Sequence, residues 1–345
     1  MSAITIDNDL VHYEVLGRGR PVVFVHGWLS SWRYWLPSMQ HLSMKYRTYA
    51  LDLWGYGDSS KDTEKLSLEA QVDLLSQFMD RLGIPKAAFI GHSLGAAVMV
   101  RYALLHPERV ARLLLISPPV FEQGPQPVET SDVPPARLAS RPPSPPTPTA
   151  RRLPPVDSLT RPLAAAPGRL PEFRPPTTLS RVTVQNPPPR DPVPPVRPDP
   201  AANPLRGLLL DVTPTELLAQ HLERETPEYD RHMVEASKTA QAALAASVAS
   251  FDRINLALEI HYLVETPTLI LHGQDDRFLP PPGDRVVQLL GGNRPTLRCE
   301  IVPSTGHFPM LSDPTNFQRL IMDFLEATDL TSLVLHKERW VRRVR

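Results

Sequence analysis

The 345-residue sequence lacks several features that would assign it to a simple functional class. It has a single cysteine, Cys299, which excludes an internal disulfide and favours a reducing compartment. Lysine plus arginine and aspartate plus glutamate number 37 each, so no excess positive charge favours nucleic acid or an anionic membrane. No apolar run approaches the roughly 18 residues of a membrane span, and no basic start followed by an apolar stretch opens the chain. We therefore expect a cytoplasmic protein with no nucleic-acid partner and no membrane contact.

Proline, in contrast, is present in unusual amount. Of the 41 prolines, 27 lie within residues 118–204. Proline removes main-chain N–H donors, and this stretch holds only two aromatic residues, Phe121 and Phe173, so it predicts a disordered insertion. The predicted organisation is a first core part at 1–117, the insertion at 118–204, a helical lid at 205–254, a second core part at 255–330, and a basic C-terminal tail at 331–345.

The blocks on either side of the insertion alternate strand and helix patterns. Residues 3–6 and 11–16 flank Asn8-Asp9 and predict an opening β-hairpin. Further strands are expected at residues 21–25, 48–53, 87–90, 112–116, 268–272 and 297–302, and helices at 31–42, 67–83, 94–105, 283–290 and 316–325. A capped helix start is expected at Thr213 with Glu216 three residues later. The predicted fold class is α/β: a mostly parallel, doubly wound sheet with an opening hairpin and a helical lid that carries the insertion.

The strongest chemical motif is Gly91-His92-Ser93-Leu94-Gly95, which lies between a predicted strand and a predicted helix. Glycines two residues before and two residues after the serine permit a sharp strand-to-helix turn that exposes the hydroxyl. We therefore predict that Ser93 is a nucleophile.

A serine hydroxyl needs a base to take its proton, and the sequence offers 11 histidines. His307 follows residues 304–306 directly after a strand, where a loop would bring it to the carboxyl edge of the sheet. His26 and His272 also end strands but precede glycines in tight turns, and His92 is fixed within the serine motif. His307 is therefore the predicted base.

A carboxylate must orient that imidazole. Asp275 and Asp276 follow the strand at 268–272 and stand between Ser93 and His307 in the chain. This gives the order serine, acid, histidine expected for such a sheet. Position in the chain alone leaves both aspartates as candidates.

Five motifs taken together resemble the α/β-hydrolase superfamily. In chain order they are His26-Gly27-Trp28, Asp52-Leu53-Trp54-Gly55-Tyr56-Gly57-Asp58-Ser59, the Ser93 motif, residues 272–280 and residues 304–310. The resemblance covers residues 1–117 and about 255–330. It implies that Asp276, three residues after Gly273, is the acid, and that the main-chain N–H groups of Trp28 and Leu94 form an oxyanion hole.

Other residues admit a structural explanation beside a functional one. Asp52 precedes Ser93 and is expected to organise the loop at 54–58 rather than to act as the acid. Trp28, Trp32, Tyr34 and Trp35 either line an acyl pocket or pack a helix on the sheet. The five cationic residues of the C-terminal tail either touch anionic lipid or form a solvated tail, and we favour the solvated tail.

The expected function is that of a serine esterase with a small-molecule acyl substrate. No metal and no cofactor are expected, because the sequence has no H-E-x-x-H, dinucleotide or Walker-type motif. Carbon–carbon bond hydrolysis, lactone opening and acyl transfer would use the same residues. Two other classes stay open: a ligand-binding protein on this fold, and a scaffold whose proline-rich insertion binds a protein partner through P-x-x-P spacing at 142–146.

Replacing residues 123–203 with a short Gly/Ser linker should leave a core that folds cooperatively, because the replaced stretch lacks a sustained helical or strand period. The measurements are the melting temperature and the rate of ester turnover. Loss of cooperatively folding protein would show that the insertion belongs to the core.

Overall fold

The computed structural model describes residues 2–121, 203–209, 212–291 and 294–340. The strands in these residues are β1 (Ser2–Ile6), β2 (Asp9–Gly17), β3 (Arg20–Val25), β4 (Tyr46–Leu51), β5 (Ala87–His92), β6 (Val110–Ile116), β7 (Thr268–Gly273) and β8 (Leu297–Val302). The α-helices are α1 (Leu36–Leu42), α2 (Leu68–Arg81), α3 (Leu94–Leu105), α4 (Leu205–Leu208), α5 (Pro214–His221), α6 (Tyr229–Ser237), α7 (Gln241–Phe251), α8 (Leu256–His261), α9 (Asp284–Gly291), α10 (Pro309–Ser312) and α11 (Pro314–Glu326). Short 3₁₀ turns occupy Trp32–Trp35, Thr63–Lys65, Pro107–Arg109 and Lys337–Arg339.

The described strands form one sheet in the order β1-β2-β4-β3-β5-β6-β7-β8. Pairing is antiparallel between β1 and β2 and between β2 and β4, and it is parallel from β4 onward. The predicted α/β class, with a mostly parallel sheet and an opening hairpin, is therefore confirmed. The hairpin turn itself is made by Asp7 and Asn8, which have positive φ angles of 48° and 67°. Asp9 already belongs to β2, so the turn begins one residue earlier than the sequence indicated.

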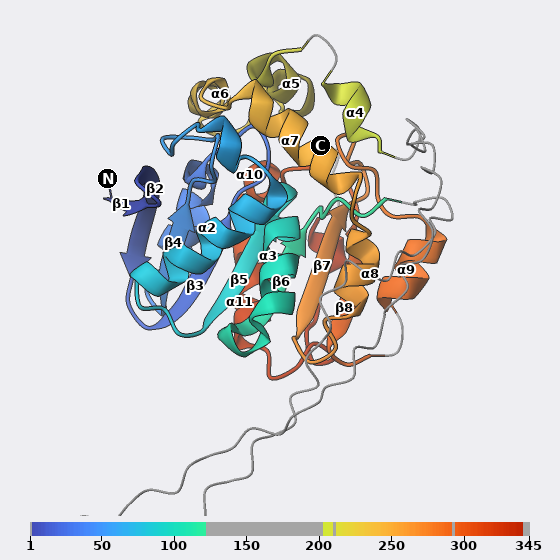
Figure 1. Cartoon of the computed structure of the whole chain (residues 1–345). Coiled ribbons are helices and arrows are strands. Elements are labelled where there is room, and N and C mark those ends of the chain that lie inside the picture. The colour runs from blue at the N-terminus through green and yellow to red at the C-terminus, as the bar shows by residue number, and fades with distance from the viewer. Residues whose placement is uncertain (1, 122–202, 210–211, 292–293, 341–345) are drawn as a thin grey trace, which may run out of the picture. The chain divides into compact units, whose positions relative to one another are not determined.

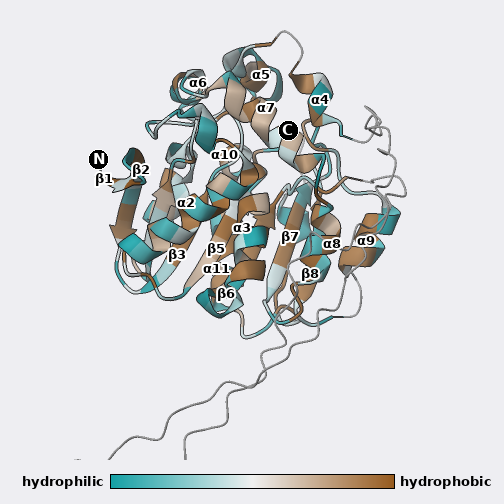
Figure 2. Ribbon diagram, viewed as in Figure 1, coloured by the Kyte–Doolittle hydropathy of each residue, from teal (hydrophilic) through white to brown (hydrophobic). Residues whose placement is uncertain are grey.

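Helices cover both faces of this sheet (Figure 1). Helices α2, α3, α8 and α9 pack one against the next, and α1 packs with α11. Strands β5 and β7 are buried along their whole length, and Figure 2 shows the central strands as mainly hydrophobic. Because these strands are buried on both faces, they read in the sequence as continuous apolar runs rather than alternating patterns.

The first predicted helix, at 31–42, is divided in the structure. It starts as the 3₁₀ turn Trp32–Trp35, capped by the Ser31 side chain, and continues as the short helix α1. Pro37 lies in the first turn of α1 and has no N–H to donate, so a helix starting at residue 31 cannot run through it unbroken. The capped start of α5 is confirmed: Thr213 and Glu216 form the reciprocal capping box.

Helices α4 to α7 lie together at one end of the sheet (Figure 1). Charged side chains hold α6 against loops of the core. Glu235 pairs with Arg33 at 3.1 Å, and Lys238 pairs with both Glu235 and Asp58. Arg33 follows β3 and Asp58 follows β4, so this helical layer covers the carboxyl ends of parallel strands.

The C-terminal segment packs on the core as far as the structure describes it. Leu333 and Trp340 are buried, and Lys337 pairs with Glu300 of β8 at 2.6 Å. Lys337 and Arg339 are nevertheless exposed, as expected of a solvated tail, and residues 341–345 lie outside the described residues. Beside Glu300, burial raises the pKa of Cys299 to about 12.

Two expectations from the sequence concern the proline-rich insertion and membrane-spanning helices. Residues 122–202 of the predicted insertion lie outside the described residues, so its disorder stays a prediction. In the described part of the chain, no helix combines the length and apolar character needed to cross a bilayer.

His272 of β7 is a polar residue in the buried interior of the sheet. It is 1% exposed, and neither ring nitrogen has a hydrogen-bond partner among the described residues. Burial lowers the pKa of His272 from 6.5 to about 4, against the opposing effect of Asp276. The folded state thus keeps this ring neutral where the unfolded chain would take up a proton.

His272→Leu should flatten the dependence of stability on pH. As pH falls from 6.5 to about 4, protonation of the unfolded chain removes about 3 kcal/mol in the wild type through this one residue. Urea unfolding at pH 7 and pH 4 measures the difference between variant and wild type, so other buried histidines cancel. Equal pH dependence in the two proteins would contradict the assignment.

Candidate active site

Ser93 occupies the turn between β5 and α3. Its φ of 52° and ψ of −115° lie outside the regions that a non-glycine residue favours. The flanking glycines make this turn possible. A Cβ on Gly91 would come within 2.7 Å of the Met99 sulfur, and one on Gly95 within 2.3 Å of the Val25 carbonyl oxygen. The sharp strand-to-helix turn predicted from the motif is therefore present.

His307 lies in the loop after β8 and is 4% exposed. Its Nδ1 is 2.8 Å from Oδ2 of Asp276. Phe278 stacks on the imidazole with the ring centroids 4.6 Å apart, and Phe308 meets it edge-on at 4.9 Å. Aromatic walls and one hydrogen bond thus fix the ring.

Asp276 follows β7 and accepts several hydrogen bonds. Its donors besides His307 are the Ser117 hydroxyl at 2.9 Å and the N–H groups of Phe278 and Leu279 at 2.9 and 2.8 Å. Burial acts to raise the pKa of Asp276, but the charge of His307 and these hydrogen bonds outweigh it and lower the pKa to about 2. The carboxylate is therefore ionised at neutral pH and can only accept, so Nδ1 of His307 carries the hydrogen. Nε2 is left with a lone pair, as a base requires.

Asp275 is placed differently. Its side chain is exposed, and its main-chain N–H donates to the Thr305 carbonyl at 2.9 Å. Of the two aspartates left open by position in the chain, the structure brings Asp276 to His307.

Three loops meet around Ser93. The ring of His92 lies 4.5 Å from that of His307, and its Nε2 is 2.9 Å from the His307 carbonyl. A Cβ on Gly27 would come within 2.7 Å of the Cβ of Ser93. The residues after β3, β5 and β8 therefore converge on one point at the carboxyl edge of the sheet.

The two predicted oxyanion donors are the residues that directly follow Gly27 and Ser93 in the sequence, Trp28 and Leu94. Leu94 opens α3, where N–H groups of the first turn lack partners within the helix. Trp28 follows Gly27 and precedes Leu29, which has a positive φ of 61°. Within the described ranges neither N–H has a protein acceptor.

Asp52 acts as a scaffold for neighbouring loops. Its side chain accepts from the N–H of Trp32 at 2.7 Å, the N–H of Asp58 at 3.0 Å and Nδ1 of His12 at 3.0 Å. This supports the structural interpretation of Asp52. His12, Asp52 and Asp58 come within 4.8 Å of one another, a spacing that could suit a cation. Because Asp58 pairs with Lys238 and Asp52 is satisfied by N–H donors, we assign no metal there.

The aromatic residues after β3 divide between packing and the site. Trp35 packs against Phe24 and Phe317, as a helix-to-sheet contact does. Trp28 meets Phe278 edge-on at 5.9 Å, on the ring that covers His307. Of Trp28, Trp32, Tyr34 and Trp35, Trp28 is the one whose ring contacts Phe278.

Two residues near His307 were not predicted from the sequence. Ser117 supports Asp276, and its place directly after β6 was a usable signal. His221 ends α5 and meets Phe278 edge-on at 4.9 Å, so α5 brings an imidazole close to the site. Burial and the charge of His307 lower the pKa of His221. No pattern within α5 itself indicated this long-range contact.

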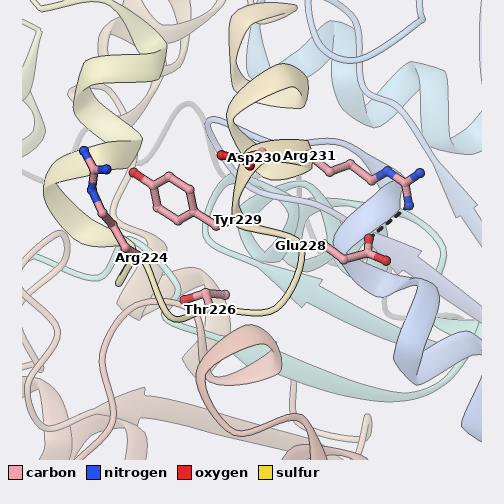
Figure 3. A pocket seen from close by; sticks show the side chains of 6 residues that line it. All are labelled: Arg224, Thr226, Glu228, Tyr229, Asp230 and Arg231. Atoms are coloured by element: carbon pink, nitrogen blue, oxygen red, sulfur yellow. Dashed lines mark hydrogen bonds and ion pairs between the residues drawn. The ribbon is translucent and has the colours of Figure 1, made fainter.

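An open surface hollow lies elsewhere, on the loop before α6 and its first turn. Figure 3 shows its lining: Arg224, Thr226, Glu228, Tyr229, Asp230 and Arg231. Arg231 pairs with Glu228 at 3.2 Å. None of the predicted site residues lines this hollow, so we do not assign the chemistry to it.

Comparison with known proteins agrees with this architecture. Residues 20–168 match the family described as alpha/beta hydrolase fold. Over 121 residues the chain is 33% identical to bifunctional epoxide hydrolase 2 of Rattus norvegicus, covering 34% of this chain and 22% of that protein. Over 106 residues it is 39% identical to the dihydrolipoyllysine-residue acetyltransferase component of the acetoin cleaving system of Pseudomonas putida, covering 30% and 29%. The alignment spans only about a fifth of the rat protein.

Solved structures agree over more of the chain. An esterase from Exiguobacterium antarcticum aligns with a TM-score of 0.63 at 16% identity, covering 94% of this chain and 98% of that one. A thermophilic esterase from Thermogutta terrifontis aligns with a TM-score of 0.61 at 19% identity, covering 94% and 97%. At such identities the likeness concerns the fold. The chain is an α/β-hydrolase-fold protein, as its motifs indicated.

Asp276→Asn should lower ester turnover far more than Asp275→Asn, the matched control on the exposed neighbour. An amide at position 276 offers a donor where Nδ1 of His307 needs an acceptor, a change worth about 10⁴ in a comparable triad. Steady-state kinetics of both variants provide the measurement. A larger loss in Asp275→Asn would reverse the choice of acid.

Proposed function

We propose that the chain is a serine hydrolase that cleaves a carboxylic ester or a related acyl substrate through an acyl-enzyme on Ser93. The observation that carries this proposal is the 2.8 Å hydrogen bond between His307 and an ionised Asp276, in the loop that contacts the Ser93 turn. The bond leaves Nε2 of His307 as the basic atom.

The proposed reaction has two balanced steps. The Ser93 oxygen attacks the substrate carbonyl while its proton passes to Nε2 of His307, and the leaving alcohol takes that proton as the carbon–oxygen bond breaks. Water then attacks the acyl carbon, giving a proton to Nε2, and the acid leaves as Ser93 regains its hydrogen. The N–H groups of Trp28 and Leu94 hold the carbonyl oxygen while it is negative, and one such donor is worth about 3 kcal/mol of barrier.

The kind of nucleophile favours acyl substrates over epoxides, although epoxide hydrolases are among the relatives. An epoxide opened by Ser93 would leave an alkyl ether on the enzyme, which has no carbonyl for water to attack. A carboxylate nucleophile would instead leave a hydrolysable ester. Lactone opening, carbon–carbon bond hydrolysis and acyl transfer all pass through an acyl-enzyme and remain alternatives within the proposal.

Location and partners belong to the same proposal. A cytoplasmic location rests on the single cysteine and the ordinary composition. A protein partner for the proline-rich insertion rests on its P-x-x-P spacing alone.

The wild type should hydrolyse p-nitrophenyl acetate and butyrate in the presence of a chelator, and a fluorophosphonate probe should label Ser93. Ser93→Ala or His307→Ala should each lower kcat by about 10⁶, because the members of such a triad act as a unit. Ser38→Ala, at a buried serine of α1, is the matched control and should keep its activity.

Two outcomes would contradict the proposal. Folded wild type that neither reacts with the probe nor turns over esters would favour a ligand-binding protein on this fold. Epoxide turnover that depends on Ser93 would refute the acyl assignment.

A further inference from the structure

Tyr34 lies in the 3₁₀ turn after β3 and is 1% exposed, yet its hydroxyl has two polar partners. The Gly27 N–H donates to the Tyr34 oxygen at 2.7 Å. The same oxygen lies 2.9 Å from Nδ1 of His92. A buried hydroxyl between these two groups connects loops that are far apart in the sequence.

The direction of each hydrogen bond follows from what each atom can do. Nε2 of His92 lies 2.9 Å from the His307 carbonyl, which can only accept, so Nε2 carries a hydrogen. Burial, reinforced by the charge of His307, lowers the pKa of His92 well below its usual value, so the ring is neutral and Nδ1 is an acceptor. Tyr34 must therefore donate to Nδ1, which leaves its oxygen lone pair for Gly27.

The result is one directed chain of hydrogen bonds. It runs from the Gly27 N–H to Tyr34, from Tyr34 to His92, and from His92 to the His307 carbonyl. Gly27, His92 and His307, which this chain connects, each adjoin or are a residue of the proposed reaction. Gly27 precedes the oxyanion donor Trp28, His92 precedes the nucleophile Ser93, and the last carbonyl belongs to the base itself.

We propose that Tyr34 is a positioning residue whose hydroxyl, through His92, fixes the spacing of the oxyanion loop, the Ser93 turn and the His307 loop. The inference deepens the proposed function and rests on it. Tyr34 touches no reacting atom; it acts through the residues that do.

The hydroxyl can be removed without removing the ring. The Tyr34 ring meets Trp35 edge-on at 4.7 Å and His92 at 5.7 Å, and phenylalanine keeps both contacts. Tyr34→Phe leaves the buried Gly27 N–H without an acceptor. It also leaves the buried Nδ1 of His92 without a donor, so the His92 ring loses one of the two hydrogen bonds that fix its orientation.

The matched control is Tyr102→Phe on α3. Tyr102 is also fully buried and packs on Phe89, but its hydroxyl has no hydrogen-bond partner among the described residues. The same atom is thus removed from the same kind of surroundings, with no hydrogen bond lost.

We expect Tyr34→Phe to lower the maximal rate of Ser93 phosphonylation by about tenfold or more, since a displacement of about 1 Å at reacting groups can lower a rate 10²-fold. The half-saturating probe concentration should stay unchanged, because Tyr34 does not contact the probe. In ester turnover kcat/KM should fall in parallel. Tyr102→Phe should match the wild type in all three quantities, measured well below each protein's melting temperature.

The variant His92→Gln allows a second test, a double-mutant cycle with Tyr34→Phe. A glutamine side chain keeps an N–H donor for the His307 carbonyl but offers Tyr34 no fixed acceptor at the Nδ1 position. If the chain acts as one unit, the Tyr34→Phe/His92→Gln double variant should lose no more rate than the worse single variant. If the two substitutions acted independently, their fold losses in rate would multiply in the double variant.

The outcomes separate this inference from the proposed function. If Ser93→Ala abolishes labelling but Tyr34→Phe labels as fast as Tyr102→Phe, the function stands and the positioning role is refuted. A loss confined to melting temperature, with rates unchanged at low temperature, also refutes it. If the wild type itself is not labelled, the proposed function has failed.

Discussion

The close approach of α3 to the end of β3 is the constraint on which the rest of the site depends. Gly95 lies so near the Val25 carbonyl that any side chain would collide with it, and Gly91 has a similarly tight neighbour in Met99. The two glycines permit this approach, and between them the chain turns at Ser93 with a positive φ. The same turn directs His92 to the His307 loop and brings the first N–H of α3 to the carboxyl edge of the sheet.

Around this turn the protein keeps nearly all polar groups uncharged. Burial lowers the pKa values of His26, His92 and His272, so these rings remain neutral. Asp276, in contrast, is ionised, and four donors satisfy it. Of the imidazoles near Asp276, His307 is the one that hydrogen-bonds to it, so this carboxylate stabilises positive charge chiefly on that ring. The proton of the proposed reaction therefore has one favourable place to go.

Local patterns in the sequence predicted the features that local chemistry determines. Short apolar runs predicted the strands, the paired glycines predicted the Ser93 turn, and Thr213 with Glu216 predicted the start of α5. Contacts between distant segments were not predictable. The Tyr34–His92 pair spans 58 residues, and the Arg33–Glu235 pair joins the core to helix α6, 202 residues away. Nothing in either local sequence indicates such a partner, because burial and chain crossing create it.

The low reactivity of Cys299, the single cysteine, would let an introduced cysteine be labelled selectively. Burial raises the pKa of this thiol to about 12, so at neutral pH it stays protonated, whereas the thiolate is the reactive species. An introduced surface cysteine would therefore take up a maleimide dye long before Cys299 does. A dye at Ser237, exposed on α6, would lie beside the ion pairs of Lys238 with Asp58 and Glu235. Fluorescence from that one position would report on the contact between α6 and the core, without removal of any native residue from the interior.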